Sequence, residues 1–145
     1  MEELKKRFSL FELLLVIAVM GLLSTLAIIA ISNARQKSRD AARLEDMTEI
    51  KTALQLYFFD TNKYPEAKEP VTLGDGNFDC LAAGGWAALG CDTSYLADVP
   101  ENPTPGGKPY RYSSDTATYT VEFELETQVG DKAAGSHALT QDGIK

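Results

Sequence analysis

Glu12 is a carboxylate close to the start of a nearly continuous apolar stretch over residues 8–31. At about 1.5 Å per residue, this stretch is long enough to cross the roughly 30 Å hydrocarbon core of a bilayer. An unpaired carboxylate in lipid costs on the order of a few kcal/mol. We therefore expect a membrane stage in which Glu12 pairs with a cation. The alternative is a carboxylate held at the lipid interface by the dipole of the helix N-terminus.

Other side chains that carry chemistry are sparse. His137 is the only histidine, and the GxSxG, P-loop and HExxH motifs do not occur in the sequence. Cys80 and Cys91 lack the C-x-x-C spacing of a redox pair, and with His137 they cannot complete a zinc site without a carboxylate. The chain is therefore not expected to be an enzyme.

The two cysteines flank a short glycine-containing segment. In a small extracytoplasmic head they predict one disulfide, worth roughly 3 kcal/mol over a loop of this size. The alternative is a pair of reduced thiols in a head that stays in the cytosol.

The net charge of −7 argues against a nucleic-acid partner, because phosphate binding needs a basic surface. The acidic balance is typical of a soluble head. Several aspartates fall in expected loops, but their spacing does not match an EF-hand, so the sequence by itself requires no cofactor. These residues are Asp75, Asp79, Asp92, Asp131 and Asp142.

One long helix is predicted over residues 8–60, which contain no proline and only one glycine, Gly21. After Ile31 the apolar residues recur every three or four positions, the pattern of an amphipathic helix. The predicted buried stripe is Leu44, Met47, Ile50, Leu54 and Tyr57, widened by Ala53 and Phe58. The predicted solvent face is Arg39, Arg43, Glu45, Asp46, Glu49 and Lys51.

A small head is expected after the helix ends near Asn62, which can adopt a left-handed cap before Tyr64-Pro65. Residues 66–107 are rich in Pro, Gly and Asp and are predicted to be mostly irregular, with a short helix at 81–89. Residues 119–126 alternate apolar and polar, which predicts a strand, with partner strands at 109–113 and 136–140.

The predicted fold class is thus α+β, with the stripe of the long helix packed under an antiparallel meander. The aromatic side chains at the end of the helix are expected to join this core. They are Tyr57, Phe58, Phe59 and Tyr64.

The segment FSLFELLLVIAVMG, after the basic residues 5–7, resembles the N-terminus of type IV pilins and pseudopilins. The motifs YFFDTNKYP and DVPENP…GKPYRY…YTVEFELE are similar to the heads of major pilins and major pseudopilins. The resemblance implies the type IV pilin fold. The expected parts are a leader at 1–7, a transmembrane or filament-core helix at 8–34, its amphipathic half at 35–60 and a globular head at 61–145.

The resemblance also implies roles for individual residues. A prepilin peptidase would cut between Arg7 and Phe8 and methylate the new amine of Phe8, and Glu12 would pair with that amine in a neighbouring subunit. The family usually has glycine where this chain has Arg7. Many pilins have a proline in the membrane helix, whereas this chain has none there. Gly21 is then the expected point of helix flexibility.

Three functions remain open from the sequence. The first is a structural subunit of a type IV pilus-like extracellular filament, a homopolymer whose precursor crosses the inner membrane once. The family implies a prepilin peptidase, an assembly ATPase and an inner-membrane platform protein as partners. The second is a major pseudopilin of a type II secretion system, in a periplasmic pseudopilus; such proteins bind calcium with a loop, which makes the loop aspartates calcium candidates. The third is a membrane-anchored binding module that keeps its leader.

Overall fold

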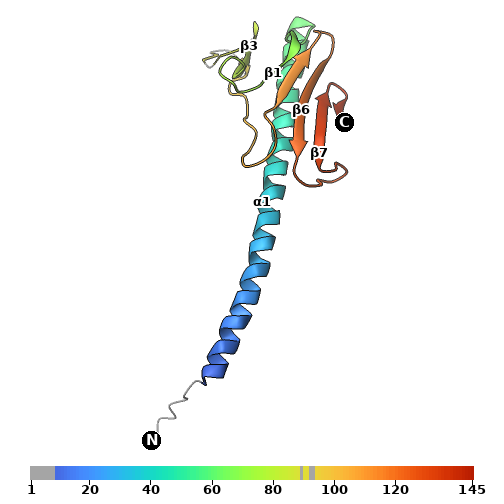
Figure 1. Ribbon diagram of the computed structural model, residues 1–145. Helices are drawn as coiled ribbons and strands as arrows, with labels where there is room; N and C mark the ends of the chain where they lie inside the picture. Colours follow the sequence, from blue (N-terminus) through green and yellow to red (C-terminus); the bar gives the residue numbers. More distant parts are fainter. Residues whose placement is uncertain (1–8, 89, 92–93) are drawn as a thin grey trace, which may run out of the picture. The chain divides into compact units, whose positions relative to one another are not determined.

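The computed structural model describes residues 9–88, 90–91 and 94–145. They group into two compact units, one ending at Arg35 and one from Gln36 to Lys145. Helix α1 (Leu10–Thr61) accounts for the first unit and begins the second (Figure 1). The Ser9 hydroxyl accepts a hydrogen bond from the Phe11 amide at its start, and Asn62 ends the helix with φ 55°. The predicted long helix is confirmed within the described residues.

The part of α1 before Arg35 is apolar and exposed along its length. It is long and apolar enough to cross a membrane by length and composition, and none of its residues is buried within the chain. Exposing apolar surface to water costs about 25 cal/mol of free energy per Å². This part of the chain is therefore suited to lipid or to other chains, not to water.

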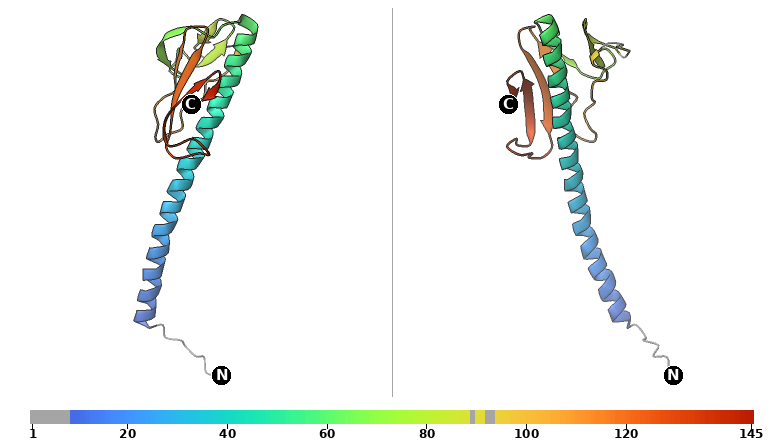
Figure 2. Two further views of the ribbon diagram at one scale, coloured as in Figure 1. Left: turned by 90° about the vertical axis from the view of Figure 1, so that its right-hand side faces the viewer. Right: turned by 180° about the vertical axis from the view of Figure 1, so that it is seen from behind.

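The second unit contains a five-stranded antiparallel sheet in the order β1-β5-β6-β7-β8. Figure 2 shows its orange and red strands beside the cyan and green part of α1. The inward side chains of β6 pack on the predicted stripe of α1, where Met47, Ile50 and Leu54 are fully buried. The α+β fold is thus confirmed. The strands are β1 (Ala67–Thr72), β5 (Arg111–Ser114), β6 (Tyr119–Leu125), β7 (Gly135–Thr140) and β8 (Gly143–Ile144).

The prediction of a helix at 81–89 is wrong for residues 81–88; Leu89 lies outside the described residues. Residues Cys80–Ala82 (β2) and Gly85–Ala87 (β3) pair as a hairpin, and Ser94–Leu96 (β4) pairs with the other edge of β2. Gly85 has φ 108°, a left-handed value that disfavours an α-helix and suits the end of the tight turn at Ala83-Gly84. Trp86 packs edge-on against Tyr112, with the ring centroids 5.1 Å apart.

The prediction that residues 66–107 are mostly irregular also missed β1. This strand contains Pro70, which is tolerated because β1 is the edge of its sheet. The end of α1 differs from expectation as well. Tyr57 and Tyr64 are buried and Phe58 packs on Tyr64, but Phe59 is 83% exposed and does not join the core.

Candidate functional site

The first feature of functional interest is the apolar part of α1 with its carboxylate. Glu12 lies in the first turn and is exposed. The hydroxyls of Ser24 and Thr25 donate to the carbonyls of Met20 and Leu22, at 2.7 Å each. Because these hydroxyls are satisfied inside the helix, the segment can enter an apolar environment without leaving them unpaired. Glu12 is then the polar group that needs a partner from outside the segment.

The other residues singled out from the sequence are placed as follows. Arg7 and Phe8 lie outside the described residues. Gly21 is within α1, and a Cβ added there would meet nothing within 4 Å. Cys80 and Cys91 are joined by a disulfide, which closes the loop that contains β2 and β3.

The loop aspartates are not gathered into a metal site within the described part of the chain. No group of three or more His, Cys, Asp or Glu side chains that could hold an ion is found there. Asp92, one of the calcium candidates, lies outside those residues.

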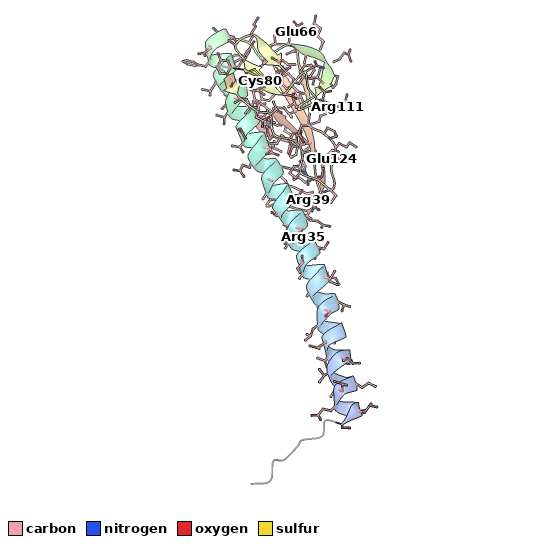
Figure 3. All side chains as sticks on the ribbon, turned by 90° about the vertical axis from the view of Figure 1, so that its left-hand side faces the viewer. Arg35, Arg39, Glu66, Cys80, Arg111 and Glu124 are labelled. Atoms are coloured by element: carbon pink, nitrogen blue, oxygen red, sulfur yellow. A yellow bond between two sulfur atoms is a disulfide. The ribbon has the colours of Figure 1, made fainter. Side chains whose placement is uncertain are left out.

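A buried ion network, which the sequence reasoning missed, ties α1 to the head. Arg43 was expected on the solvent face but is completely buried, and so is Asp40. The Arg43 guanidinium donates to Asp40 at 2.7 Å and to Glu126, just after β6, at 2.8 Å. Arg39, on the preceding turn of α1, also donates to Glu126. We call Arg39, Asp40, Arg43 and Glu126 the clasp. Arg39 is labelled in Figure 3.

The remaining bonds of the clasp reach two loops. Arg43 also donates to the Asn102 side chain at 2.6 Å and to the carbonyls of Pro103 and Gly106, so that each of its five N–H groups is used. Asp40 accepts from the amides of Glu126 and Thr127 and from the Thr127 hydroxyl. Arg43 thereby joins α1 to the loop at residues 102–106, and Asp40 joins it to the segment that follows β6.

Glycine is required where one loop approaches the clasp. Gly106 has φ 101°, and a Cβ at this position would lie 2.9 Å from the Glu126 carboxyl carbon. A side chain there would both strain the backbone and displace the carboxylate. The segment around Gly106 was predicted to be irregular, and its carbonyls bind the buried Arg43 side chain.

The electrostatics of the clasp keep its acids ionised. Hydrogen bonding from Arg39, aided by Arg43, lowers the pKa of Glu126 from 4.5 to about 2. Burial alone would raise the pKa of Asp40, but the amides of Glu126 and Thr127, the Thr127 hydroxyl and Arg43 together hold it below its ordinary value. Both carboxylates are therefore charged at neutral pH and fully engaged.

Acid is expected to destabilise the head through Glu126. Its folded-state pKa of about 2 lies below its ordinary value of 4.5, so the unfolded chain takes up the proton first as the pH falls. The stabilisation is complete above 4.5 and is lost as the pH falls towards about 2. Urea unfolding followed by near-UV circular dichroism should give a lower midpoint at pH ~3 than at pH ~6.

The control for this prediction is Glu126→Gln. It should be less stable at pH ~6 and should lose less stability on acidification, because the titrating group is gone. Not every acid of the head loses stabilisation in acid. Burial raises the pKa of Asp46, so protonation of that carboxyl at low pH favours the folded state. Equal acid sensitivity in the two proteins would contradict the role assigned to Glu126.

Comparison with known proteins supports the resemblance to pilins and pseudopilins that the N-terminal sequence indicates. No family model matches the chain, and no solved structure matches it. The chain is similar to a "Type II secretion system core protein G" of Aeromonas hydrophila, with 25% identity over 107 residues, covering 74% of this chain and 71% of the relative. It is also similar to a protein of the same name from Pectobacterium carotovorum subsp. carotovorum, with 26% identity over 65 residues.

That second match covers 45% of this chain and 42% of the relative. Both relatives bear the name of the major pseudopilin. The resemblance of this chain to the type IV pilin and major pseudopilin family is therefore confirmed.

Proposed function

We propose that this chain is the repeating subunit of a pilin-like helical filament, of the pseudopilus kind built for type II secretion. The observation that carries the proposal is the exposed apolar half of α1, which begins with one carboxylate. Such a helix requires lipid before assembly and other helices after it. The two relatives, both named for the type II secretion system, favour a pseudopilus over a surface pilus.

In this proposal the apolar helices pack in the filament core and the heads form its surface. A subunit leaves the inner membrane by exchanging lipid contacts for helix contacts. Glu12 pairs with the amine of Phe8 in a neighbour, which removes much of the cost of a carboxylate in an apolar environment. Because the pair forms at one height only, Glu12 also sets the register between subunits.

The machinery follows from the same proposal. A prepilin peptidase cuts between Arg7 and Phe8 and methylates the amine, and an assembly ATPase and an inner-membrane platform protein drive extraction. The disulfide between Cys80 and Cys91 fits a head in an oxidising compartment such as the periplasm. The precursor is a single-pass protein of the inner membrane.

The test combines the mass of the mature chain with microscopy. We expect a processed chain that begins at a methylated Phe8, a secretion defect when the gene is deleted, and no long fibres in sheared surface material. Long surface fibres of this subunit without a secretion defect would instead show a type IV pilus. A chain that keeps Met1 and stays in the membrane fraction would overturn the proposal in favour of an anchored binding module.

A further inference from the structure

The Arg43 guanidinium lies among oxygen atoms that come from three segments of the chain. Its nitrogens donate to five oxygens at distances between 2.6 and 3.0 Å, and the side chain is fully buried. We call these five oxygens the cage. Two of them belong to carboxylates, so the cage is negatively charged apart from the arginine that fills it. The cage consists of Asp40 Oδ1, Asn102 Oδ1, the carbonyls of Pro103 and Gly106, and Glu126 Oε1.

The composition of the cage is that of a site for a hard divalent cation. Calcium takes about six to eight oxygen ligands, which come from carboxylates, asparagine side chains, backbone carbonyls and water. The cage supplies each of the three protein ligand types. Only Asp40 and Glu126 in it are acidic, which distinguishes it from a cluster of carboxylates. In this chain the position of the cation is taken by an arginine, a side chain that only donates hydrogen bonds.

Contacts outside the cage hold its oxygens in position. The Asn102 side-chain nitrogen donates to the Gly106 carbonyl at 2.9 Å, which turns the Asn102 oxygen towards Arg43. Arg39 donates to both oxygens of the Glu126 carboxylate. The cage is therefore supported by bonds that do not involve Arg43 and would remain if that side chain were shortened.

The loop backbone closes tightly over the guanidinium at two consecutive glycines. Gly107, like Gly106, has a positive φ, of 76°. A Cβ at position 107 would lie 2.9 Å from the Asn102 side-chain nitrogen and 3.2 Å from Arg43 Nη2. A side chain at either glycine would thus strain the backbone and push into the cage. The loop is shaped around a positive charge.

The aspartates that the family resemblance made calcium candidates fit such an ion less well. Among the described residues, Asp131 pairs with Lys132 at 3.0 Å. Asp142 pairs with Lys145, at 3.5 Å. A lysine this close to a carboxylate already neutralises it and repels a second cation. The buried, oxygen-rich position in this part of the chain is the one that Arg43 occupies.

We propose that Arg43 takes the place of a structural calcium ion in this head. Its charge joins α1, the loop at 102–106 and the segment after β6, as a bound divalent cation would. The head then folds without calcium. Truncation of Arg43 leaves one cation, Arg39, against the two carboxylates of the clasp, and the emptied cage accepts Ca²⁺ in its place. This inference goes beyond the proposed function and does not depend on filament assembly.

The first test is the thermal melting of the full chain in detergent, followed by near-UV circular dichroism. Each protein is melted in EGTA and in about 5 mM calcium chloride, and the wild-type midpoint should agree within about 1 °C between the two. Arg43→Ala should melt below wild type in EGTA. Calcium should raise the midpoint of this variant by on the order of 5 °C, because an ion that binds only the folded state stabilises it.

Two variants and a second metal serve as controls. Arg43→Met removes the same charge but fills the cage with an apolar side chain, so calcium should raise its midpoint by less than half as much. Lys37→Ala removes an exposed cation earlier on α1 and should not respond to calcium. Magnesium demands octahedral geometry at about 2.0–2.1 Å and should stabilise Arg43→Ala less than calcium does.

The second test measures binding directly, by isothermal titration calorimetry with calcium chloride. Arg43→Ala should bind one ion per chain, and Arg43→Ala combined with Asp40→Asn should lose that site. If Arg43→Ala is unfolded in EGTA, addition of calcium should restore its near-UV signal.

Two results would overturn the inference. A wild-type head that melts several degrees higher in calcium than in EGTA would show that Arg43 does not replace the ion. An Arg43→Ala head that calcium neither stabilises nor refolds would show that the cage does not hold one. Either result would leave the proposed filament function standing, because both are measured on single chains in detergent.

Discussion

Replacing Arg43 with methionine should lower the free energy of unfolding of the head by about 3–5 kcal/mol, the cost of leaving a buried charge without its partner. Asp40 would remain fully buried with no cation in contact, and Glu126 would keep only Arg39. The carbonyls of Pro103 and Gly106 would also lose their donor. Thermal melts of the full chain in detergent, followed by near-UV circular dichroism, should show a midpoint lower by on the order of 10 °C.

Two further variants separate charge from packing. Lys37→Met, at an exposed position earlier on α1, removes a cation of similar size and should change stability by less than about 0.5 kcal/mol. Combining Arg43→Met with Asp40→Asn removes both charges and should recover part of the loss, because no uncompensated ion stays buried. If Arg43→Met melted like Lys37→Met, the clasp would not hold the head to the helix.

The clasp shows where sequence reasoning about this fold runs out. Asp40 and Arg43 lie at helical spacing among other charged residues, which is the usual pattern of a solvated helix face. Their burial depends on Glu126, which is 83 residues beyond Arg43 in the chain and follows an alternation that placed it on the polar side of its strand. Periodicity reports on local structure, and it contains no information about which distant charge will arrive.

Elements that were predicted correctly have strong local signals. The absence of proline and the repeating stripe identified α1, and the alternation from Tyr119 to Leu125 identified β6. Failures came where local signals conflict with tertiary context. The segment from Cys80 to Ala87 has helix-forming alanines, but Gly85 and the packing of Trp86 on Tyr112 favour a hairpin. The Pro, Gly and Asp content of residues 66–107 argued against a strand there, but β1 tolerates Pro70 because it is an edge strand.

The residues of the candidate site also include some that the sequence predicted and some that it did not. Glu12 and the apolar segment were identified from sequence because a carboxylate in a membrane-length stretch conflicts with its surroundings. Phe59 was assigned to the core because it is aromatic and adjoins Tyr57 and Phe58, although two residues along a helix turn it about 200° away from Tyr57 and the buried stripe. Asp40 and Glu12 are thus two carboxylates in apolar surroundings that obtain a cation in different ways. Asp40 has its cation within the fold, whereas Glu12 has none within the described part of the apolar segment.

Glu12→Ala should therefore reduce filament yield by at least about 10-fold while the head stays folded. A carboxylate unpaired in lipid costs a few kcal/mol, and pairing with a neighbour's amine recovers that cost only on assembly. Alanine stabilises the membrane-bound subunit and removes the gain, and each 1.4 kcal/mol changes an equilibrium about tenfold. Filaments released from the cell envelope by lysis would be quantified by microscopy and sedimentation, and head stability by thermal melts.

Glu12→Gln distinguishes charge from shape, because it keeps the size of the side chain and cannot form an ion pair. It should lose assembly as alanine does, whereas Glu69→Ala, a carboxylate removed from an exposed position of β1, should assemble normally. If Glu12→Gln assembled at the wild-type level, the charge would be dispensable and register would have to come from packing alone. If all three variants failed equally, the loss would reflect net charge and not a pair formed at one height between neighbours.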